Sequence, residues 1–236
     1  MLSRITLLSL LLSSGVALAQ RAPAPAASKA PSAPAVNLPP INLDEVPEQC
    51  KTTAKQAGAI SVQAALSARI SLANCIADAK LVALTLLDCE DSVLAVDEAA
   101  KMSRELLDGV IAGAIDDSTK IVAEMAKAEL YNQMTVRMMK TLPAHDGTES
   151  SIAMHNVRKS LLEGLLVKWK DAAAVSFENI LAIVKAKPAL EKNPVVASAM
   201  RTAKDRLRLH VASAKPAPAP AADDKAPTTD TGEQLR

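Results

Sequence analysis

Aromatic residues are almost missing from this chain, which has one tryptophan, one tyrosine and one phenylalanine among its 236 residues. Binding sites for sugars and nucleotides usually use aromatic side chains as flat apolar surfaces. Tyr131, Trp169 and Phe177 can together build at most one such surface. The composition therefore argues against an enzyme that acts on sugars or nucleotides.

Catalytic motifs are also missing. The chain has only seven glycines, and it contains no G-x-S-x-G, no H-E-x-x-H and no glycine-rich phosphate loop. Its three histidines, His145, His155 and His210, lack the spacing that places two metal ligands on one helical turn. We therefore expect no catalytic residue, no metal and no cofactor. An unrecognised hydrolase or metal-dependent enzyme is the alternative.

Neither sign of charge is in excess, because 27 lysines and arginines face 26 aspartates and glutamates. A formal net charge of +1 gives no electrostatic reason to bind nucleic acid or an anionic bilayer. We expect no nucleic-acid partner.

The N-terminus has the three parts of a secretory signal peptide. Arg4 precedes an apolar run over residues 5–12, and Ala17-Leu18-Ala19 forms a small-residue cleavage motif. The run is shorter than the roughly 20 residues of a membrane span. The sequence predicts cleavage after Ala19, a periplasmic or secreted protein, and no transmembrane segment.

Two segments rich in proline and alanine, 20–46 and 215–236, flank the rest of the chain. Such segments bury too little apolar surface to offset the entropy of ordering, so we expect disordered linkers. Between them, residues 47–214 have the length of one domain.

Long helices are expected in this domain, because no proline occurs between Pro47 and Pro143 and no glycine between Gly58 and Gly109. Apolar residues recur there at steps of three and four. In the segment 148–186 the expected core-facing stripe consists of Leu161, Leu165, Trp169, Ala173, Ile180 and Val184. Start and stop signals divide the pattern into segments near 47–58, 61–84, 91–114, 117–138, 148–186 and 193–214. The sequence predicts an all-α antiparallel bundle of five to six amphipathic helices, with TPR-like stacked helical hairpins as the alternative.

Three cysteines follow the signal peptide, so an oxidising compartment would pair two of them. We favour a disulfide between Cys50 and Cys75, because a turn near Gly58 can bring them together. Buried, unpaired thiols are the alternative.

Two groups of side chains are candidates for binding. The first is a methionine-rich group on one helix, which either binds apolar partners or fills the core: Met125, Tyr131, Met134, Met138 and Met139. The second is a basic helical face, Arg201, Lys204 and Arg208, which either contacts an anionic surface or acidic partner or is simply solvated.

These observations favour a non-catalytic helical module that binds protein or acts as a scaffold in a bacterial cell envelope. The alternative is a periplasmic holdase-type chaperone that uses the methionine-rich helix. The sequence is also compatible with a homo-oligomer, because long apolar stripes can pair between chains as well as within one.

Overall fold

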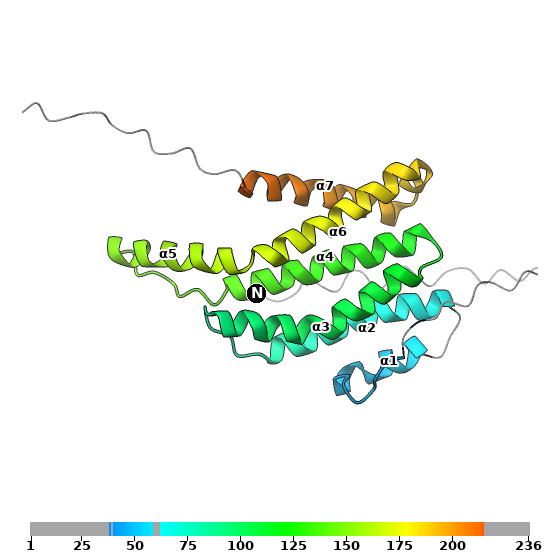
Figure 1. The fold of residues 1–236 in the computed structure, drawn as a ribbon, viewed down its shortest axis with the longest axis horizontal. Coiled ribbons are helices and arrows are strands. Elements are labelled where there is room, and N and C mark those ends of the chain that lie inside the picture. The colour runs from blue at the N-terminus through cyan, green and yellow to red at the C-terminus, as the bar shows by residue number, and fades with distance from the viewer. Residues whose placement is uncertain (1–37, 39, 59–61, 215–236) are drawn as a thin grey trace, which may run out of the picture. The chain divides into compact units, whose positions relative to one another are not determined.

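The computed structural model describes residues 38, 40–58 and 62–214, all of which belong to one compact unit that begins at Val36. The predicted signal peptide, the segment 215–236 and most of the linker 20–46 lie outside the described residues. Helices are the only regular elements of the part that is described, as the sequence predicts (Figure 1).

Seven α-helices and two short 3₁₀ helices follow one another in the described part of the chain. The 3₁₀ helices are η1 (Glu48–Cys50) and η2 (Pro188–Lys192). The α-helices are α1 (Lys51–Gly58), α2 (Val62–Ala83), α3 (Glu90–Gly113), α4 (Asp117–Met139), α5 (Glu149–Leu165), α6 (Val167–Ala186) and α7 (Pro194–Ala214).

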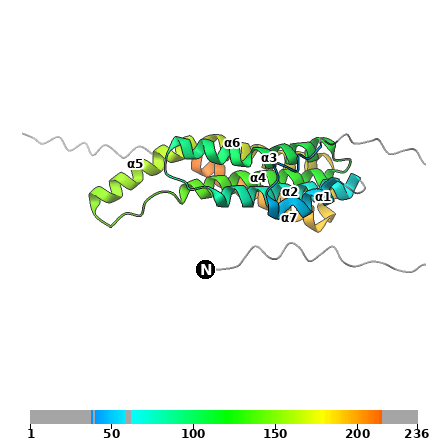
Figure 2. The same cartoon turned by 90° about the horizontal axis from the view of Figure 1, so that it is seen from below.

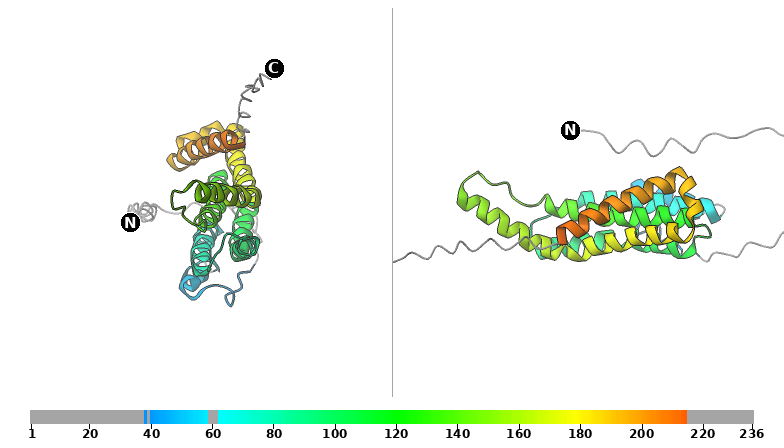
Figure 3. Two further views of the ribbon diagram at one scale, coloured as in Figure 1. Left: turned by 90° about the vertical axis from the view of Figure 1, so that its left-hand side faces the viewer. Right: turned by 90° about the horizontal axis from the view of Figure 1, so that it is seen from above.

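Helix α4 is the centre of the bundle. It packs against α2 and α3 on one side and against α6 and α7 on the other (Figures 1 and 3). The helices of the described part pack against one another as a helical bundle, as the sequence predicts.

Two apolar clusters explain this central position. One contains Leu66 of α2, Leu107 of α3 and Met134 of α4. The other contains Ile121 of α4 and Ile180 of α6. Because α4 contributes to both clusters, its apolar residues face two directions rather than the single stripe read from the sequence.

Capping side chains mark the helix starts that the sequence indicated. The Asp116 carboxylate accepts a hydrogen bond of 2.8 Å from the Thr119 backbone N–H at the start of α4. At the start of α7, the Asn193 side chain accepts one of 2.9 Å from the Val195 N–H. Asp116 is therefore the N-cap of α4, and Asp117 is an acidic residue in its first turn.

The ordered packing begins before Pro47, where the sequence placed the start of the domain. Val46 is buried, and Leu38 and Ile41 pack against the first cluster. The packed region begins earlier because these three apolar side chains, which belong to the end of the proline-rich segment, pack against the bundle.

The single helix predicted over 148–186 is wrong, because α5 and α6 are separate helices on either side of Leu166. Residues 47–214, apart from the undescribed 59–61, therefore contain seven α-helices rather than five or six. Trp169, Ala173, Ile180 and Val184 are buried as predicted, but Leu161 is 68% exposed. The break changes which face of the segment meets the bundle.

Candidate functional site

Among the α-helices of the described structure, α5 has the fewest buried residues. It diverges from the packed helices and extends past their ends (Figure 2). Leu162 is its only buried residue. A 17-residue helix that leaves nearly all of its surface open is available for contact with another molecule.

Four large apolar side chains lie along the open surface of α5. Met154 is 58% exposed, Val157 56%, Leu161 68% and Leu165 38%. Their spacing of three, four and four residues places them in one line along the helix. We call these four residues the α5 stripe.

The loop before α5 fixes where the helix begins. Gly147 has a φ of 90°, a conformation that glycine adopts without steric cost. The Thr148 side chain accepts a hydrogen bond from the Ser151 N–H. Hydrogen bonds from the Thr148 backbone and hydroxyl also hold the pKa of Asp146 below its usual value. The start of α5 is therefore specified locally.

The break after α5 is anchored in the core. Leu162 is 2% exposed and Leu166 0%. The Leu166 carbonyl accepts hydrogen bonds from the N–H groups of Trp169 at 3.1 Å and Lys170 at 3.2 Å, which start α6. Two buried leucines therefore hold one end of α5 while its other end projects.

Polar contacts hold the sides of α5. The Arg158 guanidinium lies 3.3 Å from the Asp88 carboxylate in the α2–α3 connection. His155 Nδ1 lies 2.9 Å from the Pro143 carbonyl oxygen, and its ring packs edge-on against His145. These contacts occupy one side of the helix and leave the α5 stripe open.

A polar cluster joins the start of α6 to α3. The Asp97 carboxylate accepts hydrogen bonds of 2.8 Å from Arg104 Nη1 and from the indole N–H of Trp169. Partial burial opposes ionisation of Asp97. The two hydrogen bonds, together with the charges of Arg104 and Lys168, outweigh burial and hold the pKa of Asp97 below its usual value. The cluster fixes the first turn of α6, from which α5 diverges.

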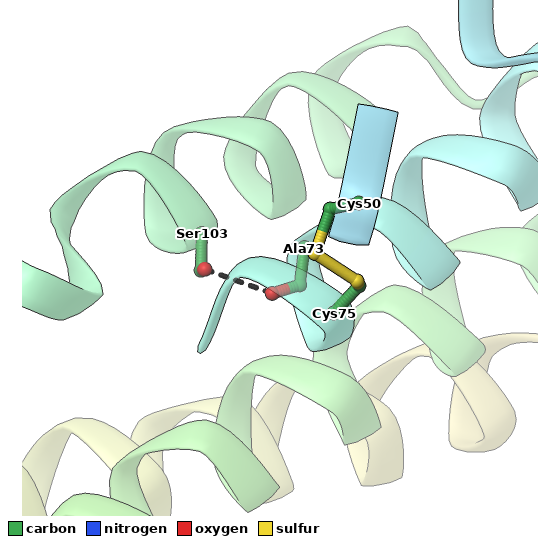
Figure 4. The surroundings of a disulfide bond; sticks show 4 residues. All are labelled: Cys50, Ala73, Cys75 and Ser103. Carbon is green, nitrogen blue, oxygen red and sulfur yellow. Dashed lines mark hydrogen bonds between the residues drawn. A yellow bond between two sulfur atoms is a disulfide. The ribbon is translucent and has the colours of Figure 1, made fainter. Parts of the chain in front are cut away.

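Cys50 and Cys75, the pair that the sequence favoured, are joined by a disulfide with a Cα–Cα distance of 5.8 Å (Figure 4). The bond ties η1 to the middle of α2. Close to it, the Ser103 hydroxyl donates a hydrogen bond of 2.8 Å to the Ala73 carbonyl. Cys89 is a half-buried free thiol. The region around the disulfide is a structural anchor at the other side of the bundle from α7.

The predicted methionine-rich group lies in the core rather than on the surface. Met134 and Met138 are fully buried. Met125, Tyr131 and Met139 are partly buried and pack against the two apolar clusters. Packing on both sides of α4 is the reason, so these five residues do not form an exposed binding surface.

The predicted basic face is exposed. Arg201, Lys204 and Arg208 all lie on the solvent side of α7. Arg201 Nε also donates a hydrogen bond of 3.4 Å to the Ala197 carbonyl of the same helix. The structure therefore leaves the three cations accessible.

A cavity of about 360 Å³ lies between the segment before α1 and helices α2 and α3. Its walls include Ile41, Asn42, Arg69, Met102 and Glu105. Burial lowers the pKa of the Arg69 guanidinium from its usual value. The walls bring together no nucleophile and general base, so the cavity does not carry a catalytic proposal.

Metal and membrane sites can be checked within the described residues. In that part of the chain, no three histidine, cysteine, aspartate or glutamate side chains come together as metal ligands. None of the helices described here combines the length and apolarity needed to cross a membrane.

The chain matches no protein-family model, and searches of characterised proteins and of solved structures return no match.

Sequence reasoning missed the α5 stripe because it assigned Leu161 and Leu165 to a core-facing stripe. Two overlapping apolar lines exist in this segment, one through Leu161 and Leu165 and the other through Leu162 and Leu166. A single buried face needs only one of them. The second apolar line was therefore the signal in the sequence that part of this segment remains exposed.

Proposed function

We propose that this chain is an exported, non-catalytic helical protein that binds a protein partner in the bacterial cell envelope, and that α5 is the helix the partner recognises. The observation that carries the proposal is the α5 stripe, a line of apolar side chains on a helix that the bundle leaves uncovered. The partner's matching surface is an apolar groove.

The spacing of the stripe supports a groove as the partner surface. Amphipathic helices insert into hydrophobic grooves through apolar anchors at positions such as i, i+3 and i+7. Met154, Val157 and Leu161 have this spacing, and Leu165 continues the same line one turn later. A helix that projects from its own bundle can enter such a groove without a clash between the two proteins.

The flank of the stripe supports the same conclusion. Ala153, Ser160 and Gly164 lie in a second line beside it, and all three are exposed. A Cβ atom added at Gly164 would meet nothing within 4 Å. Small side chains leave room for a groove wall to rise beside the anchors. This flank carries no charge, so the matching wall is uncharged as well.

Site-specific photo-crosslinking in envelope extracts tests this proposal. A photoreactive residue at position 161 lies on the stripe, and one at Asn156 lies on the opposite, exposed side of the same helix. We expect position 161 to capture one protein that position 156 does not. Equal capture at both positions contradicts the proposal.

Binding with the purified partner gives the quantitative test. Truncating an anchor at the centre of an interface typically costs about 2 kcal/mol or more. We therefore expect Leu161→Asp to lower the affinity at least about tenfold, and Asn156→Asp to leave it unchanged. Unchanged affinity in Leu161→Asp, with the helical circular dichroism signal retained, would rule out α5 as the recognised helix.

Export is tested separately. The proposal requires the chain to be recovered from the periplasm or medium with Gln20 as its first residue, because the cleavage motif ends at Ala19. N-terminal sequencing of the isolated protein gives this result directly. A full-length chain retained in the cytosol would contradict the location.

A further inference from the structure

Two helices of the bundle carry opposite charge. Helix α3 has six acidic residues and two basic ones, a net charge of −4. Helix α7 has four basic residues and one acidic one, a net charge of +3. The helices α4 and α6 lie between them (Figures 1 and 3). The two helices therefore carry opposite net charge, although two of the α3 acids, Asp97 and Asp108, are paired with lysines of α6 and α4.

The order of charges along the two faces is complementary. On α3, Glu98, Lys101 and Glu105 give the order negative, positive, negative at steps of three and four. On α7 the order is positive, negative, positive at steps of four and three, from residues 201, 205 and 208. Read backwards, the α7 steps become three and four. The two rows are therefore complementary when the helices are antiparallel. This includes Lys101 and Asp205, whose charge is opposite to that of the other two residues in their row.

Both rows are open to solvent. The side chains of Lys101 and Glu98 are 56% and 78% exposed, and their charged atoms lie 3.9 Å apart. Within the described residues, Arg201, Asp205 and Arg208 make no ion pair and are exposed. The α7 row therefore keeps its full charge for an external partner.

We propose that this partner is a second copy of the chain, with α7 of one copy antiparallel on α3 of the next. The inference does not rest on the α5 stripe. The surfaces differ, so the contact is heterologous and extends to a ring or an open chain of copies. The register pairs Glu98 with Arg208, Lys101 with Asp205 and Glu105 with Arg201.

Exposed ion pairs each contribute little and are screened by salt. We therefore expect weak association, visible by sedimentation velocity of the purified protein at about 1 mM and lost when salt is raised from ~0.01 M to ~1 M. A single monomeric species at low salt and ~1 mM overturns the proposal. So does association that high salt leaves intact.

Two charge-reversed variants test the pairing itself. In the first, the α7 row is inverted by Arg201→Glu, Asp205→Lys and Arg208→Glu. In the second, the α3 row is inverted by Glu98→Lys, Lys101→Glu and Glu105→Lys. Each variant alone places like charges opposite each other, so we expect each to be monomeric. A mixture restores both contacts and should associate as the native protein does.

The mixture is the decisive measurement, because both variants change only exposed side chains and circular dichroism checks that they fold. Association of either variant alone, or a mixture that stays monomeric, overturns the assigned register. Leu161→Asp serves as the control. It changes the α5 stripe, and we expect its self-association to equal that of the native chain.

Discussion

Helices α4 and α5 follow one another along the chain and both carry regularly spaced apolar residues, yet α4 is largely buried and α5 is largely exposed. Eight residues of α4 are buried, and one residue of α5 is. Met134 is 0% exposed on α4, and Met154 is 58% exposed on α5. Regularly spaced apolar residues show that a helix can pack against other helices, but the positions of those helices decide whether it does.

The connections explain the difference. Three residues, 114–116, join α3 to α4, which keeps α4 beside α3. Nine residues, 140–148, separate α4 from α5. The longer connection carries α5 past the ends of the helices that could cover it (Figure 2). Leu162 and Leu166 then return the chain to the core, and α6 packs along α4.

Matched methionine truncations give the largest expected contrast. Met134→Ala removes a fully buried side chain, and such changes cost about 2–5 kcal/mol because they leave a cavity. Met154→Ala removes an exposed one, and we expect a change within about 0.5 kcal/mol. Urea unfolding followed by circular dichroism measures both. Similar losses in the two variants would show that α5 is covered in solution.

The disulfide is expected to have the next largest effect. Replacing Cys50 and Cys75 by alanine together releases a link between residues 25 apart, which should lower the free energy of unfolding by about 3 kcal/mol. The link lies in the part of the bundle that contains α2 and α3, so amide exchange in α5 should change little. Cys89→Ala is the control, and we expect it to retain native stability. An equal loss in that variant would contradict the assignment.

A smaller loss of stability is expected when the hydrogen bonds between α6 and α3 are weakened. Asp97→Asn weakens charged hydrogen bonds to Arg104 and Trp169 and should cost about 1–2 kcal/mol at neutral pH. Because the folded pKa of Asp97 is lowered, its contribution is present above the unfolded pKa of about 3.9. It is lost as pH falls through the folded pKa.

Unfolding titrations at several pH values measure this difference between the native chain and Asp97→Asn. Glu98→Gln on the same helix is the matched control, because its side chain is 78% exposed. A penalty in Asp97→Asn that persists at the lowest pH would show that the loss does not come from the charge of Asp97.

The all-helical class, the capped starts at Asp116 and Asn193 and the burial of Trp169 could be read from the sequence, because caps and periodicity are local signals. The break at Leu166 could not. It follows no proline, and Gly164 alone does not end a helix. The two-sided burial of α4 was also missed, since it depends on helices far away along the chain.

Of the candidate binding surfaces, too, some could be predicted from the sequence and some could not. The exposure of Arg201, Lys204 and Arg208 agrees with the helical face read from the sequence. The methionines of α4 left two interpretations open, because methionine suits both a core and an adaptable surface, and their burial agrees with the first of these. The α5 stripe required knowledge of which apolar line met the bundle.

The smallest expected effect tests whether α5 behaves as a separate unit. Gly164 lies near the end of α5, and a Cβ there meets nothing within 4 Å. Gly164→Ala should therefore stabilise the helix by about 0.5–1 kcal/mol, because alanine loses less backbone entropy. If α5 opens locally, native-state hydrogen exchange will show slower exchange in α5, with the urea midpoint and the exchange in α4 unchanged. A shifted urea midpoint would instead mean that α5 unfolds together with the bundle, and the contrast with α4 would then be one of exposure and not of stability.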